Sequence, residues 1–528
     1  MSRGVAGAAV LIGAITILAR VTGFAKQLVF ARAVGTNCLA TAYYTANQVP
    51  NIVFELVVGG ALAGMVVPVL AGRVDATAEA GRIASALMTW VLTLLVPLAI
   101  VVGLLAGPIT GLFTGGVRGC DPAALGDVAA RMLVVFAPQI PLYGMAVVLY
   151  GLLQAHRRFT APALAPLVSS VVVIVAYLAF APLSEGLRDP AQVPRPAELA
   201  LSAGTSLGVL ALVVTVLGPA ARLGLPWRPA YRFPDGVAPI VRRLALAGLA
   251  ALLAQQVAMA VALKLANAQG GAGVLAAYNY AWAIYMVPYA VLAVPIATSA
   301  FPELSARAGD GSESAFAALA SRTTRAVTVI SGLAAGALAA VATPVAAVFL
   351  SQTDTQVPEA DFARAIALFA PGLVGFGLMT HLSRVLYADG RGRAAARGQV
   401  LGWAAVVVAQ TVFVFAFPDE WKLGGLALGQ TAGMTLGGVL LLAAVWRARG
   451  RAVLAGMGRA SVAAVAGGVA GFLAGTGVAV LLGSAGPWRA LVTAVAAGIA
   501  AVGVGGLVAA SVDPSDVRAT LAKAGRPS

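Results

Sequence analysis

Charge is the scarcest feature of this chain. Of its 528 residues only 10% are Asp, Glu, Lys or Arg, whereas 60% are hydrophobic and the mean hydropathy is +0.92. Soluble domains carry about 25% charged residues, so a water-soluble fold is excluded. A membrane β-barrel would need short alternating segments of about ten residues, but the apolar runs here last roughly 20 to 30 residues. The sequence therefore predicts an all-α polytopic membrane protein.

Cysteine and histidine are also nearly absent. The two cysteines, Cys38 and Cys120, exclude a zinc cluster or a disulfide framework, although a single bridge between them stays open. The two histidines, His156 and His381, have no carboxylate motif beside them, and no GxxxxGK[ST] phosphate loop occurs. The sequence thus predicts a protein that is not an enzyme, with no cofactor and no metal site.

About 14 apolar stretches are long enough to cross a bilayer. They lie near residues 5–33, 40–71, 84–113, 128–154, 160–183, 198–221, 238–266, 272–302, 318–350, 362–388, 395–417, 423–446, 457–483 and 487–511. The first is interpreted as a retained helix, because no small-residue cleavage site and soluble domain follow it.

The basic residues are distributed unequally between the two sides of this topology. Twenty-four of the 35 Lys and Arg residues fall on the side of the N-terminus, seven on the other side and four inside the membrane. Because positive residues stay on the cytoplasmic side during insertion, both termini are predicted to be cytoplasmic, in a multi-pass protein of the inner membrane. The net charge of +15 then reflects topology and contact with anionic lipids, and no nucleic-acid partner is predicted.

A short internal repeat relates the second and eighth stretches. Ala42-Tyr43 recurs as Ala277-Tyr278, and a Pro-x-Leu-x-x-Arg pattern at 68–73 recurs at 302–307. Chance similarity between two Ala/Val-rich helices is the alternative. Because six stretches separate the copies, both run in the same direction, as in parallel repeats about an axis along the membrane normal. We expect pseudo-symmetric six-helix lobes at 1–222 and 223–450, followed by two additional helices and a short tail at 451–528.

Five ionisable side chains lie far from the ends of the stretches: Arg20, Lys26, Arg32, Glu55 and Lys264. A charge at membrane depth costs several kcal/mol unless it is paired or faces water, so such residues normally line a pathway. Four bases against one acid predict a cationic cavity and an anionic cargo. Snorkelling to the interface is the alternative for Lys264, and structural pairing is the alternative for Glu55.

Candidate hinges accompany these charges. Arg20 and Lys26 are six residues apart and do not share a face of an ideal helix, so a bend at Gly23 is expected if both line one cavity. Asn47, Pro50 and Asn51 form a helix-breaking patch in which both amides are available to a freed carbonyl or to a sugar. Pro288 is a candidate hinge in the eighth stretch, with a simple kink as the alternative.

Several segments resemble a known family. Ala-Arg-Val-Thr-Gly-Phe-Ala-Lys at 19–26, Ala-Asn-Gln-Val-Pro-Asn at 46–51 and Val-Pro-Val-Leu at 67–70 resemble the start of the MurJ (MviN) lipid II flippases of the MOP exporter superfamily. Residues 280–288 and 384–391 resemble later landmarks of that family. The form of the second segment is similar to the actinobacterial branch.

The resemblance implies a function and assigns residues to it. The family exports lipid II, an undecaprenyl-diphosphate-linked saccharide-peptide, from the inner to the outer leaflet by alternating access. Arg20 and Lys26 match two required cations, and Arg32, Asn47, Asn51, Glu55 and Lys264 complete the expected substrate-binding set. Where many relatives carry charged pairs, this chain has Phe54-Glu55 and Trp282-Ala283. Gln255, Gln256 and Gln410 stand where some members bind sodium, so a hard-cation site is poorly supplied.

The sequence also allows two other functions. A related transporter for another polyprenyl-linked glycan or for a drug would share the helix pattern, although a cation exporter would need more intramembrane acids. A membrane scaffold that recruits cell-wall or cell-division proteins through its basic loops would not need intramembrane cations at all.

Overall fold

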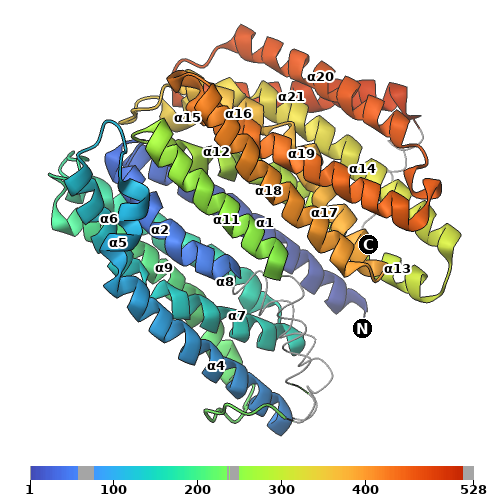
Figure 1. Cartoon of the computed structure of the whole chain (residues 1–528). Helices are drawn as coiled ribbons and strands as arrows, with labels where there is room; N and C mark the ends of the chain where they lie inside the picture. The colour runs from blue at the N-terminus through green and yellow to red at the C-terminus, as the bar shows by residue number, and fades with distance from the viewer. Residues whose placement is uncertain (1, 57–76, 235–236, 238–248, 515–528) are drawn as a thin grey trace. The chain divides into compact units, whose positions relative to one another are not determined.

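The computed structural model describes residues 2–56, 77–234, 237 and 249–514 (Figure 1). Helices dominate these ranges, and no β-strand occurs within them. Thirteen helical stretches in this part of the chain are long and apolar enough to cross a membrane. A further helix, α2 (Cys38–Leu56), lies at the position of the second predicted span. The prediction of an all-α polytopic membrane protein is confirmed.

The chain divides into two compact units. Unit 1 comprises Met1–Gln256 together with Gly271–Ala276, and unit 2 comprises Val257–Gly270 together with Ala277–Ser528. The expected boundaries at residues 222 and 450 stay a prediction. Each unit is described by itself below.

Unit 1 is built from helices that pack pairwise along their lengths. Besides α2 they are α1 (Ser2–Ala33), α4 (Thr77–Leu104), α5 (Ala106–Thr114), α6 (Pro122–Phe136), α7 (Gln139–Ala155), α8 (Thr160–Leu183) and α9 (Arg195–Ala221). Helix α8 packs against both α1 and α9, and α6 packs against α2. α11 (Leu249–Leu265) begins in unit 1 and ends in unit 2.

Unit 2 contains the remaining helices. They are the π-helix η2 (Ala266–Gly270), α12 (Val274–Pro288), the π-helix η3 (Tyr289–Ala293), α13 (Val294–Gly309), α14 (Glu313–Ala340), α15 (Ala342–Leu350), α16 (Glu359–Phe369), α17 (Gly372–Ala388), α18 (Gly392–Ala416), the 3-10 turn η4 (Asp419–Trp421), α19 (Lys422–Arg449), the 3-10 turn η5 (Arg451–Leu454), α20 (Met457–Leu482) and α21 (Pro487–Val512). Helix α12 starts within the segment that belongs to unit 1.

The two units repeat the same helix breaks. In unit 1 a helix of 28 residues and one of 9 residues, α4 and α5, meet at Leu105, and in unit 2 α14 and α15 have the same lengths and meet at Val341. A second break follows Phe136-Ala137-Pro138 in unit 1 and Phe369-Ala370-Pro371 in unit 2. Proline ends the preceding helix because its ring clashes with the previous turn and it lacks an N–H donor. These shared breaks add structural support to the internal repeat. Of the short motifs that suggested it, the copy at residues 68–73 lies outside the described part of the chain.

The repeat extends to buried polar contacts. Tyr43 on α2 bonds the hydroxyl of Tyr177 on α8 at 2.6 Å and that of Thr205 on α9 at 2.9 Å. Tyr278 on α12 accepts a hydrogen bond from Gln410 Nε2 on α18 at 3.2 Å. Buried polar groups need such partners, so the two tyrosines fix the N-terminal parts of α2 and α12 in their units.

The connection after α9 is held along α4. The amides of Arg228 and Ala230 donate to Ser85 Oγ at 3.2 Å and to Thr89 Oγ1 at 3.1 Å. Because Ser85 and Thr89 are four residues apart, their hydroxyls lie on one face of α4. This ordered segment was expected only as a basic loop.

The two C-terminal helices pack through glycine. α20 and α21, coloured orange to red in Figure 1, lie side by side, and both contact α14. A Cβ on Gly336 of α14 would lie 2.1 Å from the carbonyl oxygen of Gly468 on α20. Such close backbone approach is typical of small residues in membrane helix pairs.

Cys38 and Cys120 form a disulfide, with their Cα atoms 5.7 Å apart. The sequence left this pairing open. It joins the start of α2 to the connection that precedes α6.

Candidate functional site

The candidate cations of unit 1 lie on α1. This helix packs against α8, and it runs without interruption through Gly23, so the expected bend does not appear as a break in the helix. Arg20 is exposed, whereas Lys26 and Arg32 are partly buried. Lys26 makes no hydrogen bond or ion pair with any residue that the structure describes. A desolvated ammonium without a partner is costly, so Lys26 is available to an anion.

α2 presents a polar face. Asn47, Asn51 and Glu55 follow one another at intervals of four residues, and Tyr44 precedes Asn47 by three. Residues at these spacings are neighbours on a helix surface. The Oδ1 atom of Asn47 is buried and has no hydrogen-bond partner among the described residues. The face therefore offers hydrogen-bonding groups along one side of α2.

One hydrogen bond connects the two helices. The hydroxyl of Tyr44 on α2 donates to Oε1 of Gln27 on α1 at 2.8 Å. Gln27 follows Lys26 directly, so this bond holds the polar face of α2 close to the segment of α1 that carries the cation. Sequence reasoning missed Gln27 and Tyr44. The signals were the polar pair at 26–27 and the spacing of Tyr44 from Asn47.

An aromatic core fixes these helices in unit 1. The ring of Phe30 on α1 lies 4.6 Å from Tyr43, 5.1 Å from Tyr44 and 4.9 Å from Tyr177, measured between ring centroids. Phe30 and Tyr43 are at most 1% exposed. Aromatic pairs at such distances add about 0.5–1.5 kcal/mol each beyond burial. The polar groups are thus presented from a rigid support.

Glu55 is exposed on α2 and forms no ion pair with any residue in the described ranges. Structural pairing with Lys26 or Arg32, the alternative weighed from the sequence, is not found there. Pro50 is buried, and α2 continues through it as a helix. Hinge roles for Gly23 and Pro50 stay predictions.

The remaining candidates belong to unit 2. Lys264 is exposed in the last turn of α11, immediately before the π-helix η2. Pro288 is the last residue of α12, and the π-helix η3 follows it. π-Helical turns are rare and occur frequently at functional sites, which is consistent with a hinge at Pro288.

One residue of each pair at which relatives were expected to carry charges is aromatic here: Phe54 beside Glu55 and Trp282 beside Ala283. The ring of Phe54 lies 4.3 Å from that of Tyr143 on α7. Trp282 packs against Tyr285 and Phe376, at 5.4 and 6.3 Å between centroids. Phe54 and Trp282 therefore contribute packing.

The glutamines at the expected sodium positions differ in their environment. Gln410 is fully buried, and its Nε2 atom donates to Leu426 O at 3.0 Å as well as to Tyr278. Gln256 is 5% exposed, and its Nε2 atom has no partner in the described part of the chain. Gln410 joins α18 to α12 and α19 and is therefore a packing residue.

Comparisons with known proteins agree with this arrangement. The family model described as "Lipid II flippase MurJ" matches residues 30–495. A lipid II flippase MurJ of Burkholderia cenocepacia is 28% identical over 390 residues, which cover 71% of each chain. A probable lipid II flippase MurJ of Rhizobium tropici is 26% identical over 443 residues, which cover 83% of this chain and 80% of the relative.

Solved structures show the same fold. A lipid II flippase MurJ in an inward closed conformation superposes with a TM-score of 0.74 at 16% identity, covering 97% of this chain and 100% of the other. An inward-facing multidrug resistance MATE family transporter of the MOP superfamily gives a TM-score of 0.65 at 17% identity, covering 86% of this chain and 98% of the other. The fold is therefore that of the polytopic transporters of the MOP superfamily. Since the family model spans most of its length, the chain belongs to the lipid II flippase MurJ family.

Proposed function

We propose that this chain moves lipid II, the undecaprenyl-diphosphate-linked saccharide-peptide precursor of peptidoglycan, from the inner to the outer leaflet of the cytoplasmic membrane. It acts as a transporter and not as a catalyst. Family membership supports this function. The observation that carries it is Lys26 on α1, which has no partner among the described residues and lies beside the polar face of α2 through the bond between Gln27 and Tyr44.

The diphosphate of the cargo is bound by the cations of α1. The guanidinium of Arg20 donates two parallel hydrogen bonds to one phosphate, and the ammonium of Lys26 acts as a compact charge on the other. Arg32 adds positive potential in the last turn of the same helix. Binding replaces water around these groups with phosphate oxygens, which keeps the charges compensated at membrane depth.

The remaining candidates bind the headgroup and control release. Asn47 and Asn51 exchange hydrogen bonds with sugar hydroxyls and peptide amides, since an amide both donates and accepts. Glu55 lies one turn beyond Asn51 and competes with the phosphates for the cations as the site changes its exposure. Lys264 on α11 is a further cation for the cargo. Bending near Pro50 and Pro288 accompanies alternating access.

The disulfide supports the proposed topology. Disulfides persist on the oxidising side of the cytoplasmic membrane and are rare in the cytosol. Cys38 and Cys120 then lie outside, which agrees with the excess of arginines on the opposite side and with cytoplasmic termini. The basic cytoplasmic connections contact anionic lipids and are available to cell-wall or division proteins.

Driving energy comes from proton exchange or from the membrane potential. Gln255, Gln256 and Gln410 supply no carboxylate for a hard cation. The potential acts on the charge of the cargo with about 2.3 kcal/mol per elementary charge and 100 mV.

Depletion of the protein in the cells that make it tests the function. We expect lipid II to accumulate in the inner leaflet, where an added outer-leaflet probe or hydrolase does not reach it. Purified protein in liposomes is expected to restore access of that probe to lipid II. Unchanged precursor turnover on depletion would exclude the flippase. Transport of other polyprenyl-linked glycans or of drugs in the same liposomes, without lipid II, would favour a related exporter.

A further inference from the structure

The turn that joins η2 to α12 belongs to a different unit from the segments on either side of it. Its residues Gly271–Ala276 group with unit 1, whereas the segments on both sides, Val257–Gly270 and Ala277 onward, group with unit 2. The chain therefore passes from unit 2 into unit 1 for six residues and then returns to unit 2.

Backbone hydrogen bonds hold this turn on a seat in unit 1. The amide of Ala272 donates to the carbonyl oxygen of Arg118 at 2.9 Å, and the amide of Gly273 donates to Thr41 Oγ1 at 2.9 Å. The seat thus consists of the connection before α6, which carries Arg118, and the start of α2 with the connection before it.

Glycine is required at the centre of the contact. Gly273 has a φ of +78°, which side chains rarely adopt, and a Cβ there would lie 2.3 Å from the carbonyl oxygen of Thr36. Gly271 has a φ of +86°, and a Cβ on it would lie 3.2 Å from the carbonyl oxygen of Arg118. A side chain at position 273 would therefore meet both an unfavourable backbone conformation and a steric clash with the connection before α2.

The disulfide joins the two halves of the seat. Cys38 opens α2 and follows Asn37, and Cys120 follows Arg118 by two residues. Asn37 also orders the first half, because its Nδ2 donates to Val34 O at 2.8 Å while its Oδ1 accepts from the amide of Ala40 at 3.0 Å. Without the bridge, the connections before α2 and before α6 would be held together only by noncovalent contacts.

The segment before the docked turn has a different helical geometry. η2 is a π-helix that follows α11 directly and packs against α19 of unit 2. π-Helical turns are less stable than α-helix and often lie at functional sites. η2 is therefore the element that can change its winding while the turn stays seated.

We propose that Gly271–Ala276 is a docked tether, and that oxidation of Cys38 and Cys120 locks its seat and makes transport depend on the redox state outside the cell membrane. The transport half of this proposal rests on the proposed function. During the transport cycle the tether stays with unit 1, and η2 takes up the motion of unit 2. The bridge forms when two thiols lose two protons and two electrons, and the electrons reduce the disulfide of an external thiol oxidant by exchange.

Hydrogen exchange on the full chain in lipid nanodiscs tests the tether. In the Cys38→Ser/Cys120→Ser variant and in Gly273→Ala, we expect the amides of residues 272 and 273 to exchange at least about tenfold faster than in the parent chain. Arg228 and Ala230, whose amides bind α4, provide an internal reference that should not change. Gly186→Ala is the matched control, because Gly186 has a φ of +80° and no atom within 4 Å of its Cβ position, and it lies in the connection between α8 and α9, outside the seat.

Gly273→Ala keeps the disulfide, so the test does not depend on whether the cysteine variant folds. Unchanged exchange at 272–273 in this variant would overturn the tether. Reductant added to the parent chain should reproduce the effect of the cysteine variant, and failure to do so would overturn the redox lock.

A transport assay separates this proposal from the proposed function. We expect Gly273→Ala to lower the rate of lipid II translocation several-fold without changing lipid II binding, and we expect Gly186→Ala to leave the rate unchanged. Faster exchange with unchanged translocation would refute the role in transport. If the parent chain translocates no lipid II, the proposed function fails, while the exchange result still decides the docking.

Discussion

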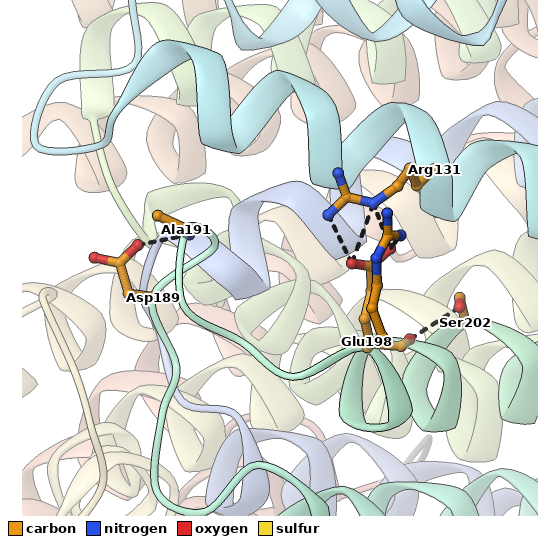
Figure 2. A network of polar contacts seen from close by, with 6 residues as sticks. Arg131, Asp189, Ala191, Glu198 and Ser202 are labelled. Atoms are coloured by element: carbon orange, nitrogen blue, oxygen red, sulfur yellow. Dashed lines mark hydrogen bonds and ion pairs between the residues drawn. The ribbon is translucent and has the colours of Figure 1, made fainter.

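Arg131 on α6 and Glu198 on α9 form a two-pronged ion pair (Figure 2), with Arg131 Nε 3.0 Å from Oε1 and Nη2 2.7 Å from Oε2. Glu198 is 3% exposed, and Nη1 of Arg195 lies 3.6 Å from its Oε1. Arg364 has the corresponding place on α16 in unit 2, where it bonds Asp361 at 3.1 Å and stacks on Trp421. Each unit thus holds an arginine at the same end of its repeat, with different partners.

Glu198→Gln should destabilise unit 1. The neutral amide keeps the shape but removes the charge that compensates Arg131, and we expect a loss of about 1–3 kcal/mol in the free energy of unfolding. Thermal unfolding in detergent measures the loss. Glu303→Gln is the control, because its pair with Arg307 is exposed and should contribute less than about 1 kcal/mol. Equal effects of the two substitutions would contradict a special role of the buried pair.

Substitution of the cations on α1 should affect transport and not folding. Each charge-assisted bond to phosphate contributes about 1.5–3 kcal/mol, so we expect Arg20→Gln and Lys26→Gln to lower lipid II translocation about tenfold or more. Lys26→Arg should retain most of the activity because it preserves the charge. The measurement is probe access to lipid II in liposomes, with expression and unfolding temperature followed in parallel.

Arg393→Gln is the matched control for these variants. Arg393 is exposed at the start of α18 and makes no contact that contributes to the proposed site. Full translocation by Lys26→Gln would remove Lys26 from the binding site. A protein that acts as a scaffold and transports nothing would keep its function in both Arg20→Gln and Lys26→Gln.

Much of the fold followed from hydropathy alone. Apolar runs and their breaks predicted the helices, because a bilayer imposes both length and composition on a spanning helix. The breaks at Leu105 and Val341 were not predicted, although Pro108 and Pro344 stand three residues after them. Each proline ring clashes with the carbonyl of the residue four positions before it, which is the last residue of α4 or of α14. The third and ninth predicted spans consequently each contain two helices, α4 with α5 and α14 with α15.

The candidate site was predictable only in part. The charges at Arg20, Lys26 and Glu55 were visible because charge is rare in such a sequence. The bond between Gln27 and Tyr44 was not, because it depends on how α1 and α2 pack through Phe30. Pairing of Cys38 with Cys120 was left open for the same reason, since spacing along a chain does not give the distance between two Cα atoms.

Removal of the two corresponding tyrosine hydroxyls should cost similar amounts. Tyr43→Phe loses bonds to Tyr177 and Thr205, and Tyr278→Phe leaves Gln410 with one partner fewer. We expect about 1 kcal/mol or slightly more for each in the free energy of unfolding. Because the two lie in different units, their effects should be additive in the double variant.

Tyr150→Phe is the control for the tyrosine series. The hydroxyl of Tyr150 is buried without a hydrogen-bond partner among the described residues, so its removal should be neutral or slightly stabilising. A destabilisation by Tyr150→Phe as large as that by Tyr43→Phe would mean that the loss comes from ring packing and not from the hydrogen bonds.

Gly336→Ala should loosen the C-terminal helices from α14. In an unobstructed helix the change from glycine to alanine stabilises by about 0.5–1 kcal/mol. Here the added Cβ would lie 2.1 Å from Gly468 O, so the helices must separate, and overpacking of this kind costs about 1–3 kcal/mol. The steric cost is the larger effect, and we expect a lower unfolding temperature and faster proteolysis between α19 and α20. Gly503→Ala in α21, where no atom lies within 4 Å of the Cβ position, should leave both unchanged or improve them. If Gly336→Ala behaves like Gly503→Ala, close backbone contact between α14 and α20 is not what holds the two additional helices in place.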